Sequence, residues 1–572
     1  MLENEFARVG LLLGSDPHSA YYREVLEHSG IPFDLLDLKS GFDLSSVDVL
    51  VMAGEGELPA SMRERLSSWM RLGGSIVCSA SLWGLGDVLG LEANYDGRHP
   101  SRDLVFPVKA GERAWPDKAG PARFFGGFYA RATDAQPIAQ TSTGSIAASR
   151  RKVGKGVALA FTVHVGQTVA LMCMGRSVEC DAVGPSDGSA RLDDHRLRAE
   201  DGIALSFEKD RAQAGTSEHP LFITPHADIV REVWIRLILE AVETTGKRLA
   251  MYWPWPNNAE GGACISVDCE EFSPGNVMAL HNVLAMAGAN AAWLVAQPGY
   301  ALDVYRSFRK WDHEIGLLFS ADEDGHLNDE KLKIQHVAMS RAASIPVLSS
   351  IRLPDGGWVR YDRLYELADY TGSKVSLSKG GRQPGTSGFA FGTCQPFHPI
   401  RRDWSSMRVL EIPYQVFMPG HIVPESAVSA IIDQTVARHG CFHVVVTSAA
   451  TQDGHVSMVL RRSIALAKHA KLEYMLPQEI ARYERTRRSL RTRTWTDGEK
   501  FGFNVVAEDQ LENLTVLISG DPVSVAFGGK PLKSRTIQRL GMNWTVAVLD
   551  LEAKSQAGIE LSRLGDSLSA AA

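Results

Sequence analysis

Apolar runs and amphipathic stretches alternate along the N-terminal part of the chain. The pattern predicts strands at 8–13, 33–36, 47–52 and 75–78, with helices at 20–29 and 59–72. Strands and helices that alternate at this spacing indicate a parallel α/β sheet. We therefore expect residues 1–95 to form a flavodoxin-like α/β domain.

The pattern is less regular from residue 96 to 250. β-like runs occur at 157–163 and 167–174, and an amphipathic helix is predicted at 229–245. A polar stretch at 185–211, rich in Asp, Arg and Gly, is typical of a long loop. We expect this part to be an irregular β-rich and helical continuation of the N-terminal region.

The C-terminal part has a different pattern. Short apolar runs at 503–507, 514–518, 523–527 and 544–549 are separated by Gly, Pro and Asn turns, which predicts a small antiparallel β-sandwich for residues 494–572. The central span, 251–493, is then a separate domain of an α/β multidomain protein.

A largely helical segment at 463–493, interrupted near Pro477, precedes the predicted sandwich. Its last part, 482–493, carries six arginines. A solvated helix face and a site for an anionic glycan or phosphate are two interpretations of this charge run.

Composition narrows the class of protein. At 572 residues the chain is too long for one core, and its formal charge of -7 gives no electrostatic reason to expect a nucleic-acid partner. No apolar run reaches the length of a membrane span, and the acidic start lacks the features of a secretory signal. Seven cysteines form no CxxC pair, which favours free thiols and a cytoplasmic location.

Cys78 lies at the end of the predicted strand 75–78. The N-terminal part resembles a class I glutamine amidotransferase-like domain, in which such a strand leads to a thiol nucleophile on a tight elbow. Val77 and Ser79 flank Cys78 where a working elbow needs small residues, and no His-x-Glu pair follows. We therefore expect a buried structural cysteine, with a nucleophile as the alternative.

An apolar stretch at 265–272 carries acids at its end, with Asp268 first among them. A buried strand that delivers carboxylates at its C-terminal end is a common position for a general base or metal ligand in α/β enzymes. Asp268 is therefore the first candidate site residue.

Residues from about 262 to 490 resemble the polysaccharide deacetylase family. The resemblance rests on landmarks in the family's order: the acidic strand end at 266–270, His-Glu-Ile-Gly at 313–316, Gly-Thr-x-x-Pro-Phe at 392–397 and Leu-Glu-Ile-Pro at 410–413. It implies a distorted (β/α) barrel that removes acetyl groups from amino-sugar glycans with the help of a divalent metal. Such a metal polarises the acetyl carbonyl and activates water.

The resemblance also implies roles for particular residues. Asp268 matches the base, Arg352 is expected to orient it, and Glu270 is the candidate acidic ligand for zinc.

The later landmarks add substrate-binding candidates. Phe397, His398 and Glu411 are expected to line the glycan cleft. For His398, a buried and hydrogen-bonded histidine is the alternative.

The metal-binding histidines of the family are missing. Their expected positions hold Leu318 and Asp322, and leucine cannot bind a metal. Asp322 and His326 are four residues apart and form a displaced candidate site with Asp268 and Glu270. An ordinary polar loop is the alternative for this stretch.

Two functions follow. The first is a divergent carbohydrate N-deacetylase that acts on an amino-sugar glycan or its precursor with the help of a zinc ion. The second is a catalytically inactive glycan-binding or scaffold protein of exopolysaccharide biosynthesis, without a metal, whose partners are polysaccharide-assembly proteins.

Overall fold

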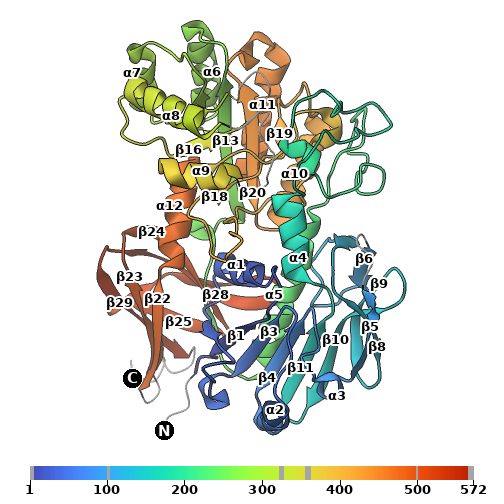
Figure 1. The fold of residues 1–572 in the computed structure, drawn as a ribbon. Helices are drawn as coiled ribbons and strands as arrows, with labels where there is room; N and C mark the ends of the chain where they lie inside the picture. Colours follow the sequence, from blue (N-terminus) through green and yellow to red (C-terminus); the bar gives the residue numbers. More distant parts are fainter. Residues whose placement is uncertain (1–4, 99–102, 321–327, 354–362, 498–499, 564–572) are drawn as a thin grey trace. The chain divides into compact units, whose positions relative to one another are not determined.

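The computed structural model describes residues 5–98, 103–320, 328–353, 363–497 and 500–563 (Figure 1). The chain divides into two compact units that are each built from separated segments. Unit 1 comprises Met1–Val169, Ile229–Asn258 and Tyr483–Ala572, and unit 2 comprises Ala170–Asp228 and Ala259–Arg482. The division into four consecutive domains stays a prediction.

The first sheet of unit 1 has nine strands in the order β2-β1-β3-β4-β11-β10-β9-β6-β7. The strands from β2 to β11 in this order are parallel, and the pairs from β11 to β7 are antiparallel. In chain order, the nine strands are β1 (Val9–Leu13), β2 (Asp34–Leu36), β3 (Val49–Ala53), β4 (Ser75–Ser79), β6 (Asp103–Pro107), β7 (Ala122–Phe124), β9 (Gln136–Thr141), β10 (Ile146–Val153) and β11 (Gly156–Phe161).

The predicted elements of this sheet are confirmed within one or two residues. Helices α1 (Ala20–Ser29) and α2 (Ala60–Leu72) connect the first strands, and α5 (His226–Thr244) follows later. Strands β3 and β4 are buried throughout, which explains their continuous apolar sequences. The parallel α/β arrangement is therefore present, while the flavodoxin-like classification stays a prediction.

The β-like run predicted at 167–174 is wrong. This segment is helical, with α4 (Val165–Val169) followed by the π-helical η2 (Ala170–Met174). The backbone N–H of Gln167 donates to Nδ1 of His164 at 3.1 Å, so the histidine caps the first turn. Short apolar runs do not distinguish a buried strand from a buried helix, and here the cap favours the helix.

Unit 1 also contains two larger antiparallel sheets, besides the two-stranded antiparallel sheet of β5 (Leu91–Arg98) and β8 (Phe128–Ala132). One has the order β12-β24-β28-β27 and the other the order β22-β23-β29-β25-β26. The strands are β12 (Ala250–Tyr252), β22 (Arg491–Asp497), β23 (Lys500–Ala507), β24 (Leu511–Ser519), β25 (Val523–Phe527), β26 (Lys530–Leu532), β27 (Ser534–Arg539), β28 (Met542–Leu551) and β29 (Ser555–Arg563). The antiparallel β-structure of the C-terminal part is present, and its classification as a β-sandwich stays a prediction.

Both interpretations of the arginine run are wrong for its two central members. Arg487 and Arg488, at the end of α12 (Pro477–Arg488), have side chains that are only 1% and 10% exposed. Arg487 pairs with Glu484. Arg488 pairs with Glu484 and with Glu24 of α1, both at 2.7 Å. The charges therefore form a buried network that ties α12 to α1.

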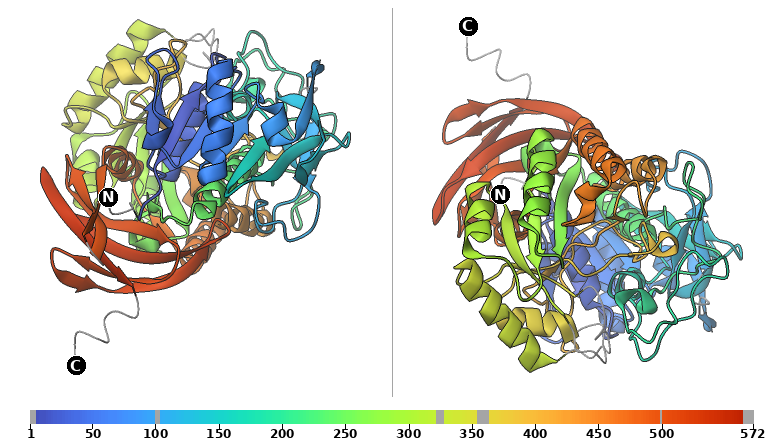
Figure 2. Two further views of the ribbon diagram at one scale, coloured as in Figure 1. Left: turned by 90° about the horizontal axis from the view of Figure 1, so that it is seen from below. Right: turned by 90° about the horizontal axis from the view of Figure 1, so that it is seen from above.

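Unit 2 contains a curled parallel sheet in the order β18-β17-β16-β15-β14-β13-β20-β19, with β21 (Leu472–Tyr474) beside the start of β13. Helices connect most of the strands, and Figure 2 shows them, green to orange, around the strands of this unit. The strands are β13 (Gly261–Cys269), β14 (Ala292–Val295), β15 (Glu314–Leu318), β16 (Ser350–Arg352), β17 (Val375–Ser376), β18 (Leu410–Glu411), β19 (Val416–Phe417) and β20 (Cys441–Thr447). The helices are α6 (Pro274–Met286), α7 (Leu302–Lys310), α8 (Asp329–Ala343), α9 (Arg363–Thr371), α10 (Glu425–Ala437) and α11 (Gly454–His469).

A parallel sheet with helical connections is the arrangement that the barrel prediction requires. All of β13 is buried, because it lies between β14 and β20 in the middle of the sheet. None of the helices in the described ranges is long and apolar enough to cross a bilayer.

Candidate functional site

Asp268 lies at the C-terminal end of the central strand β13 of unit 2. It is the penultimate residue of this strand, between Leu294 of β14 and Thr447 of β20, and its side chain is 1% exposed. Because all neighbouring strands are parallel, their C-terminal ends meet at the edge that carries Asp268. Side chains from β16 and from the loop after β17 converge on it there.

Arg352, the last residue of β16, forms a buried ion pair with Asp268. Its Nη1 lies 2.6 Å from Oδ1 of Asp268. Its Nε donates to the carbonyl oxygen of Leu377, and its Nη2 donates to Oγ of Ser266, both at 2.6 Å. Three fixed partners hold the guanidinium in one orientation, as the predicted orienting role of Arg352 requires.

The hydrogen-bond chain continues to a buried histidine. Oγ of Ser266 accepts from Arg352, so its own proton is directed to Nε2 of His443 at 2.8 Å. Nδ1 of His443 donates to the carbonyl oxygen of Ile412 at 3.1 Å. Burial and the nearby charge of Arg352 lower the pKa of His443 to about 3, so this histidine is neutral and supports the arginine.

A second arginine lies beside the same carboxylate. Nη2 of Arg382 is 3.8 Å from Oδ2 of Asp268 and 4.0 Å from Oε1 of Glu270, and the guanidinium lies over the ring of Phe417. No hydrogen bond from a described residue reaches Oδ2 of Asp268, although this atom is buried. Asp268 therefore has one oxygen fixed by Arg352 and one oxygen near a partly exposed cation.

The described residues around Asp268 do not form a metal site. Leu318 is buried at the end of β15, and burial raises the pKa of the Cys269 thiol, which disfavours the thiolate that a metal requires. Glu270 is the remaining candidate ligand there, with a half-exposed side chain. Asp322 and His326 lie outside the described residues, so the displaced site stays a prediction.

Glu411 and Lys379 are two buried charged residues, joined through the backbone of the loop after β17. Oε1 of Glu411 accepts from the backbone N–H groups of Ser378 and Lys379 at 3.0 and 2.9 Å, and burial raises the pKa of this carboxyl. Nζ of Lys379 donates to the carbonyl oxygen of Met174 at 2.6 Å, and burial lowers the pKa of the lysine to about 7. Glu411 thus shapes the loop after β17, and its predicted contact with a glycan stays a prediction.

Phe397 and His398 lie next to this pair. Phe397 is buried and exchanges backbone hydrogen bonds with Glu411. Nδ1 of His398 donates to the carbonyl oxygens of Met407 and Val409 at 3.0 and 3.1 Å. These bonds favour the structural alternative for His398, and the substrate-binding role of both residues stays a prediction.

The His-Glu-Ile-Gly landmark lies at the opposite end of the sheet. His313 precedes β15, and its Nδ1 accepts from the backbone N–H of Ala291. Nε2 is therefore the protonated nitrogen, and it donates to Nδ1 of His281 at 3.1 Å. His313 lines a cavity of 510 Å³ together with Asp312 and Glu479. Because a parallel strand separates this end from Asp268, the landmark does not contribute to the candidate site.

Glu314, the first residue of β15, is buried and changes the stability of the protein with pH. Burial raises its pKa from 4.5 to about 7, while Ser350 and the backbone N–H of Gln478 donate to its two oxygens. The native state then binds more protons than the unfolded state between these values, so the free energy of unfolding falls as pH rises from about 4.5 to about 7.

We expect Glu314→Gln to remove this part of the pH dependence, because the amide has no charge to bury. The free energy of unfolding of the wild-type protein, minus that of the variant, should fall by roughly 3 kcal/mol between pH 4.5 and pH 7.5. Urea unfolding at a series of pH values measures it. If the free energy of unfolding changes with pH equally in the two proteins, the proposed effect of Glu314 is wrong.

A second group of titratable side chains lies in unit 1, and the sequence interpretation missed it. Asp16 follows β1, His164 follows β11, and one ligand atom from each of Asp16, His18 and His164 lies within 4.8 Å of the others. Burial opposes ionisation of Asp16, but hydrogen bonding to His164 and its charge outweigh it and hold the pKa of Asp16 well below its usual range. Burial lowers the pKa of His18. In the described part of the chain, no other group of His, Cys, Asp and Glu has metal-binding spacing.

Cys78 lies inside β4 and not on an elbow. It pairs with Met52 of β3 and Ala160 of β11, and burial raises the pKa of its thiol far above the usual value. The residue in the left-handed region after this strand is Ala80, with a φ of 69°. An alanine has no nucleophilic atom, so these features favour the structural role of Cys78.

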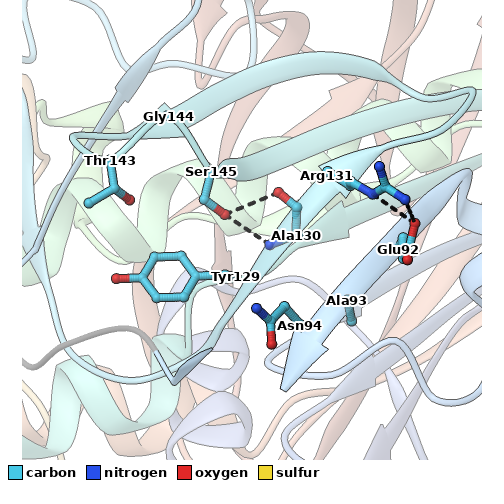
Figure 3. A pocket seen from close by; sticks show the side chains of 9 residues that line it. All are labelled: Glu92, Ala93, Asn94, Tyr129, Ala130, Arg131, Thr143, Gly144 and Ser145. Carbon is cyan, nitrogen blue, oxygen red and sulfur yellow. Dashed lines mark hydrogen bonds and ion pairs between the residues drawn. The ribbon is translucent and has the colours of Figure 1, made fainter. Parts of the chain in front are cut away.

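A further cavity of 860 Å³ lies on unit 1, against β5 (Leu91–Arg98) and β8 (Phe128–Ala132) (Figure 3). Its wall carries Tyr129 and an exposed ion pair between Arg131 and Glu92. Oγ of Ser145 exchanges hydrogen bonds with the backbone of Ala130 at 2.9 and 3.1 Å. None of the predicted site residues lines this cavity.

Comparison with known proteins gives structural likeness only. No protein-family model and no curated protein matches the sequence. The chain is similar in structure to Agd3, described as a novel carbohydrate deacetylase, with a TM-score of 0.44 and 10% identity over 97% of this chain and 99% of that chain. It is similar to a Mycobacterium smegmatis protein named as a polysaccharide deacetylase, with a TM-score of 0.31 and 13% identity over 43% of this chain and 96% of that chain. The β-galactosidase from Rahnella sp. R3 has a TM-score of 0.23 and 17% identity over 29% of this chain and 30% of that chain. All three TM-scores are below 0.5, so these similarities assign neither a family nor an activity to this chain.

Proposed function

We propose that this is a polysaccharide deacetylase-like protein that acts on an acetylated amino-sugar glycan at the Asp268 site. The observation that carries the proposal is the position and orientation of the Asp268 carboxylate. Asp268 ends the central strand of a parallel sheet, its Oδ1 is fixed by Arg352 at 2.6 Å, and its Oδ2 accepts no hydrogen bond from the described residues. An oriented carboxylate with one available oxygen has the geometry of a general base.

The proposed reaction is hydrolysis of the acetamide of an amino sugar. Oδ2 of Asp268 takes a proton from a water molecule as the water oxygen adds to the acetyl carbonyl carbon. The C–N bond then breaks as the proton passes from Asp268 to the sugar nitrogen, which leaves as an amine. Acetic acid is released and ionises to acetate, and Asp268 is again a carboxylate. Arg352 holds Oδ1 of Asp268 at 2.6 Å, so Oδ2 keeps its orientation during the proton transfer.

A zinc ion in the family's manner does not fit the described residues alone. Leu318 offers no ligand atom, and Arg352 and Arg382 place two positive charges within 3.8 Å of the carboxylate oxygens. Such charges oppose the binding of a divalent cation. No step of the proposed reaction is therefore routed through a metal.

The second candidate function is glycan binding without hydrolysis. Two observations favour it. Leu318 removes a metal ligand, and Arg352 and Arg382 place positive charge beside Asp268 where the family has a metal ion. The guanidinium of Arg382, which is partly exposed, and the ring of Phe417 provide a hydrogen-bond donor and an apolar surface for a sugar.

An acetate-release assay on the full chain separates the two functions. We expect oligomers of N-acetylglucosamine to be deacetylated, and Asp268→Asn to lower the rate by about 10²- to 10⁴-fold, the usual contribution of a general base. The asparagine keeps an oxygen that accepts from Arg352, so the fold should persist, which circular dichroism verifies. Asp303→Asn, an exposed carboxylate of α7, is the matched control and should keep the wild-type rate.

Each result has a distinct meaning for the two candidates. Release of acetate at equal rates by wild-type protein and Asp268→Asn would overturn the proposed role of Asp268. Binding of the oligomers by both proteins without any acetate release would establish the second candidate. Neither binding nor release would reject both.

A further inference from the structure

Three side chains from two distant segments of the sequence meet at one edge of the parallel sheet in unit 1. Asp16 and His18 lie in the loop after β1, and His164 lies after β11. Because β1 and β11 belong to the parallel part of the sheet, their C-terminal ends are at the same edge. This edge is the usual position for ligands of open α/β sheets.

The strand order places a natural crevice at this edge. β1 lies between β2 and β3. The chain therefore adds β2 on one side of β1 and then crosses over to add β3 on the other side. Ligands of such sheets bind where the order reverses, outside the carboxyl ends of the two central strands. A cavity of 380 Å³, lined by Glu55, Ser81 and Phe128 among others, opens beside this point.

Asp16 is held rigidly at this edge of the sheet. Its Oδ2 accepts from the backbone N–H of Glu55 at 2.8 Å and from Oγ of Ser19 at 2.5 Å, while its Oδ1 lies 3.0 Å from Nε2 of His164. A Cβ on Gly54 would lie 2.5 Å from Oδ2 of Asp16, so glycine is required for this close approach. Oδ1 also accepts from the backbone N–H of His18 at 2.9 Å, so this oxygen lies between the backbone of His18 and the imidazole of His164.

His18 supplies the second ligand atom. Its ring stands edge-on to that of His164, with the centroids 5.8 Å apart. Neither ring nitrogen of His18 makes a hydrogen bond within the described part of the chain, and the side chain is only partly buried. An imidazole whose ring nitrogens make no hydrogen bond retains a nitrogen lone pair for a ligand.

His164 supplies the third atom and has a supporting partner. Nε2 faces Oδ1 of Asp16, and the hydroxyl of Tyr22 lies 3.3 Å from Nδ1. Tyr22 in turn lies 2.9 Å from Oγ of Ser79, which donates to a backbone carbonyl, so the phenol proton is directed to Ser79. The phenol oxygen is therefore able to accept from Nδ1–H of His164.

Binding of a metal at Nε2 of His164 requires a change of tautomer. Without a metal, Nδ1 accepts from the N–H of Gln167 and the proton on Nε2 is shared with Asp16. With a metal, the proton moves to Nδ1 and is donated to Tyr22, and the N–H of Gln167 gives up its bond to Nδ1. Metal-bound histidines commonly donate their other nitrogen in this manner, which fixes the ring and increases its basicity.

We propose that Asp16, His18 and His164 bind a divalent metal ion of the zinc class, at a site separate from Asp268. One carboxylate and two imidazoles form the ligand set of many zinc sites, and three protein ligands leave a fourth position for water or substrate. Zinc binds these atoms at about 2.0–2.2 Å, so ligands of one ion lie within about 4.4 Å of each other. The three ligand atoms lie within 4.8 Å of one another, so metal binding needs only small side-chain movements.

Metal titration of the full chain after removal of metals with a chelator tests the site. We expect one zinc ion per chain by calorimetry, and an absorption band of cobalt bound to nitrogen and oxygen when Co²⁺ replaces it. His18→Ala should weaken zinc binding by at least about 100-fold, since one of three protein ligands is lost. His195→Ala, an exposed histidine of unit 2, is the matched control and should bind as the wild-type protein does.

Folding and binding are measured separately. His18 makes no side-chain hydrogen bond to the described residues, so His18→Ala should fold, and saturating zinc should raise the melting temperature of the wild-type protein and not of this variant. Tyr22→Phe should weaken binding by about 10- to 100-fold through loss of the partner of Nδ1. Equal binding by wild-type protein and His18→Ala, or no uptake of zinc or cobalt, would overturn the proposal.

The assay also distinguishes this site from a metal in the barrel. Zinc that is retained in His18→Ala and lost in Glu270→Gln would belong to the Asp268 region. That outcome would reject the site in unit 1 and leave the deacetylase proposal open to its own assay.

Discussion

Arg352→Met is expected to lower the free energy of unfolding by about 3–5 kcal/mol, the usual cost of removing one partner of a buried ion pair. Asp268 is 1% exposed and would lose the guanidinium that lies 2.6 Å from its Oδ1. The change also removes the hydrogen bonds to Ser266 and to the carbonyl oxygen of Leu377. Equilibrium unfolding in urea measures the loss, with the midpoint moving to lower denaturant concentration at an unchanged m-value.

Two further variants establish the cause. Asp268→Leu combined with Arg352→Met removes both charges and should recover much of the lost stability, since apolar replacement of a buried pair is often close to neutral. Arg462→Met breaks the exposed pair with Glu425 and should change stability by less than about 1 kcal/mol. A loss of similar size in Arg352→Met and Arg462→Met would contradict the assignment of Asp268 and Arg352 as a tightly coupled pair.

Arg488→Met is expected to have an effect of similar size in unit 1. Arg488 pairs with Glu24 of α1 and with Glu484 of α12, and the side chains of these glutamates are 4% and 5% exposed. Removal of the guanidinium leaves Glu24 buried without its cation, which costs about 3–5 kcal/mol. Thermal unfolding should show a clearly lower melting temperature.

An exposed arginine nearby provides the control. Arg491 pairs with Glu508 at 3.4 Å on the surface, where both side chains are largely exposed. Arg491→Met should shift the melting temperature little, because surface ion pairs contribute about 0–1 kcal/mol. If Arg488→Met behaves like Arg491→Met, the network between α1 and α12 does not stabilise the fold.

The sequence predicts those parts of the protein that depend on local pattern. The continuous apolar runs of β3, β4 and β13 and the position of Asp268 at the end of β13 follow from one stretch of chain each. The run at 167–174 was ambiguous for the same local reason, and the cap from His164 decided it in favour of a helix.

Groups that meet from distant segments were not predictable in this way. Asp16 and His164 are separated by 148 positions, and only the placement of β11 beside β4 brings them together. Arg382 likewise reaches Asp268 from a loop without a periodic pattern. The sequence does contain one signal for this group. Asp16 and His18 form an Asp-x-His motif after the first strand, and His164 follows a later strand of the same sheet.

The arrangement of unit 1 sets the order in which the protein can be completed during synthesis. Strand β12 needs β24 as its partner, and α1 needs the end of α12, but β24 and α12 leave the ribosome only after nearly all of unit 2 has been made. The early segments of unit 1 therefore keep apolar surface exposed until the C-terminal segments have been synthesised. We expect chaperones to bind mainly to these early segments. A nascent chain that stops before residue 483 should contain every described residue of the Asp268 site and still lack a finished unit 1.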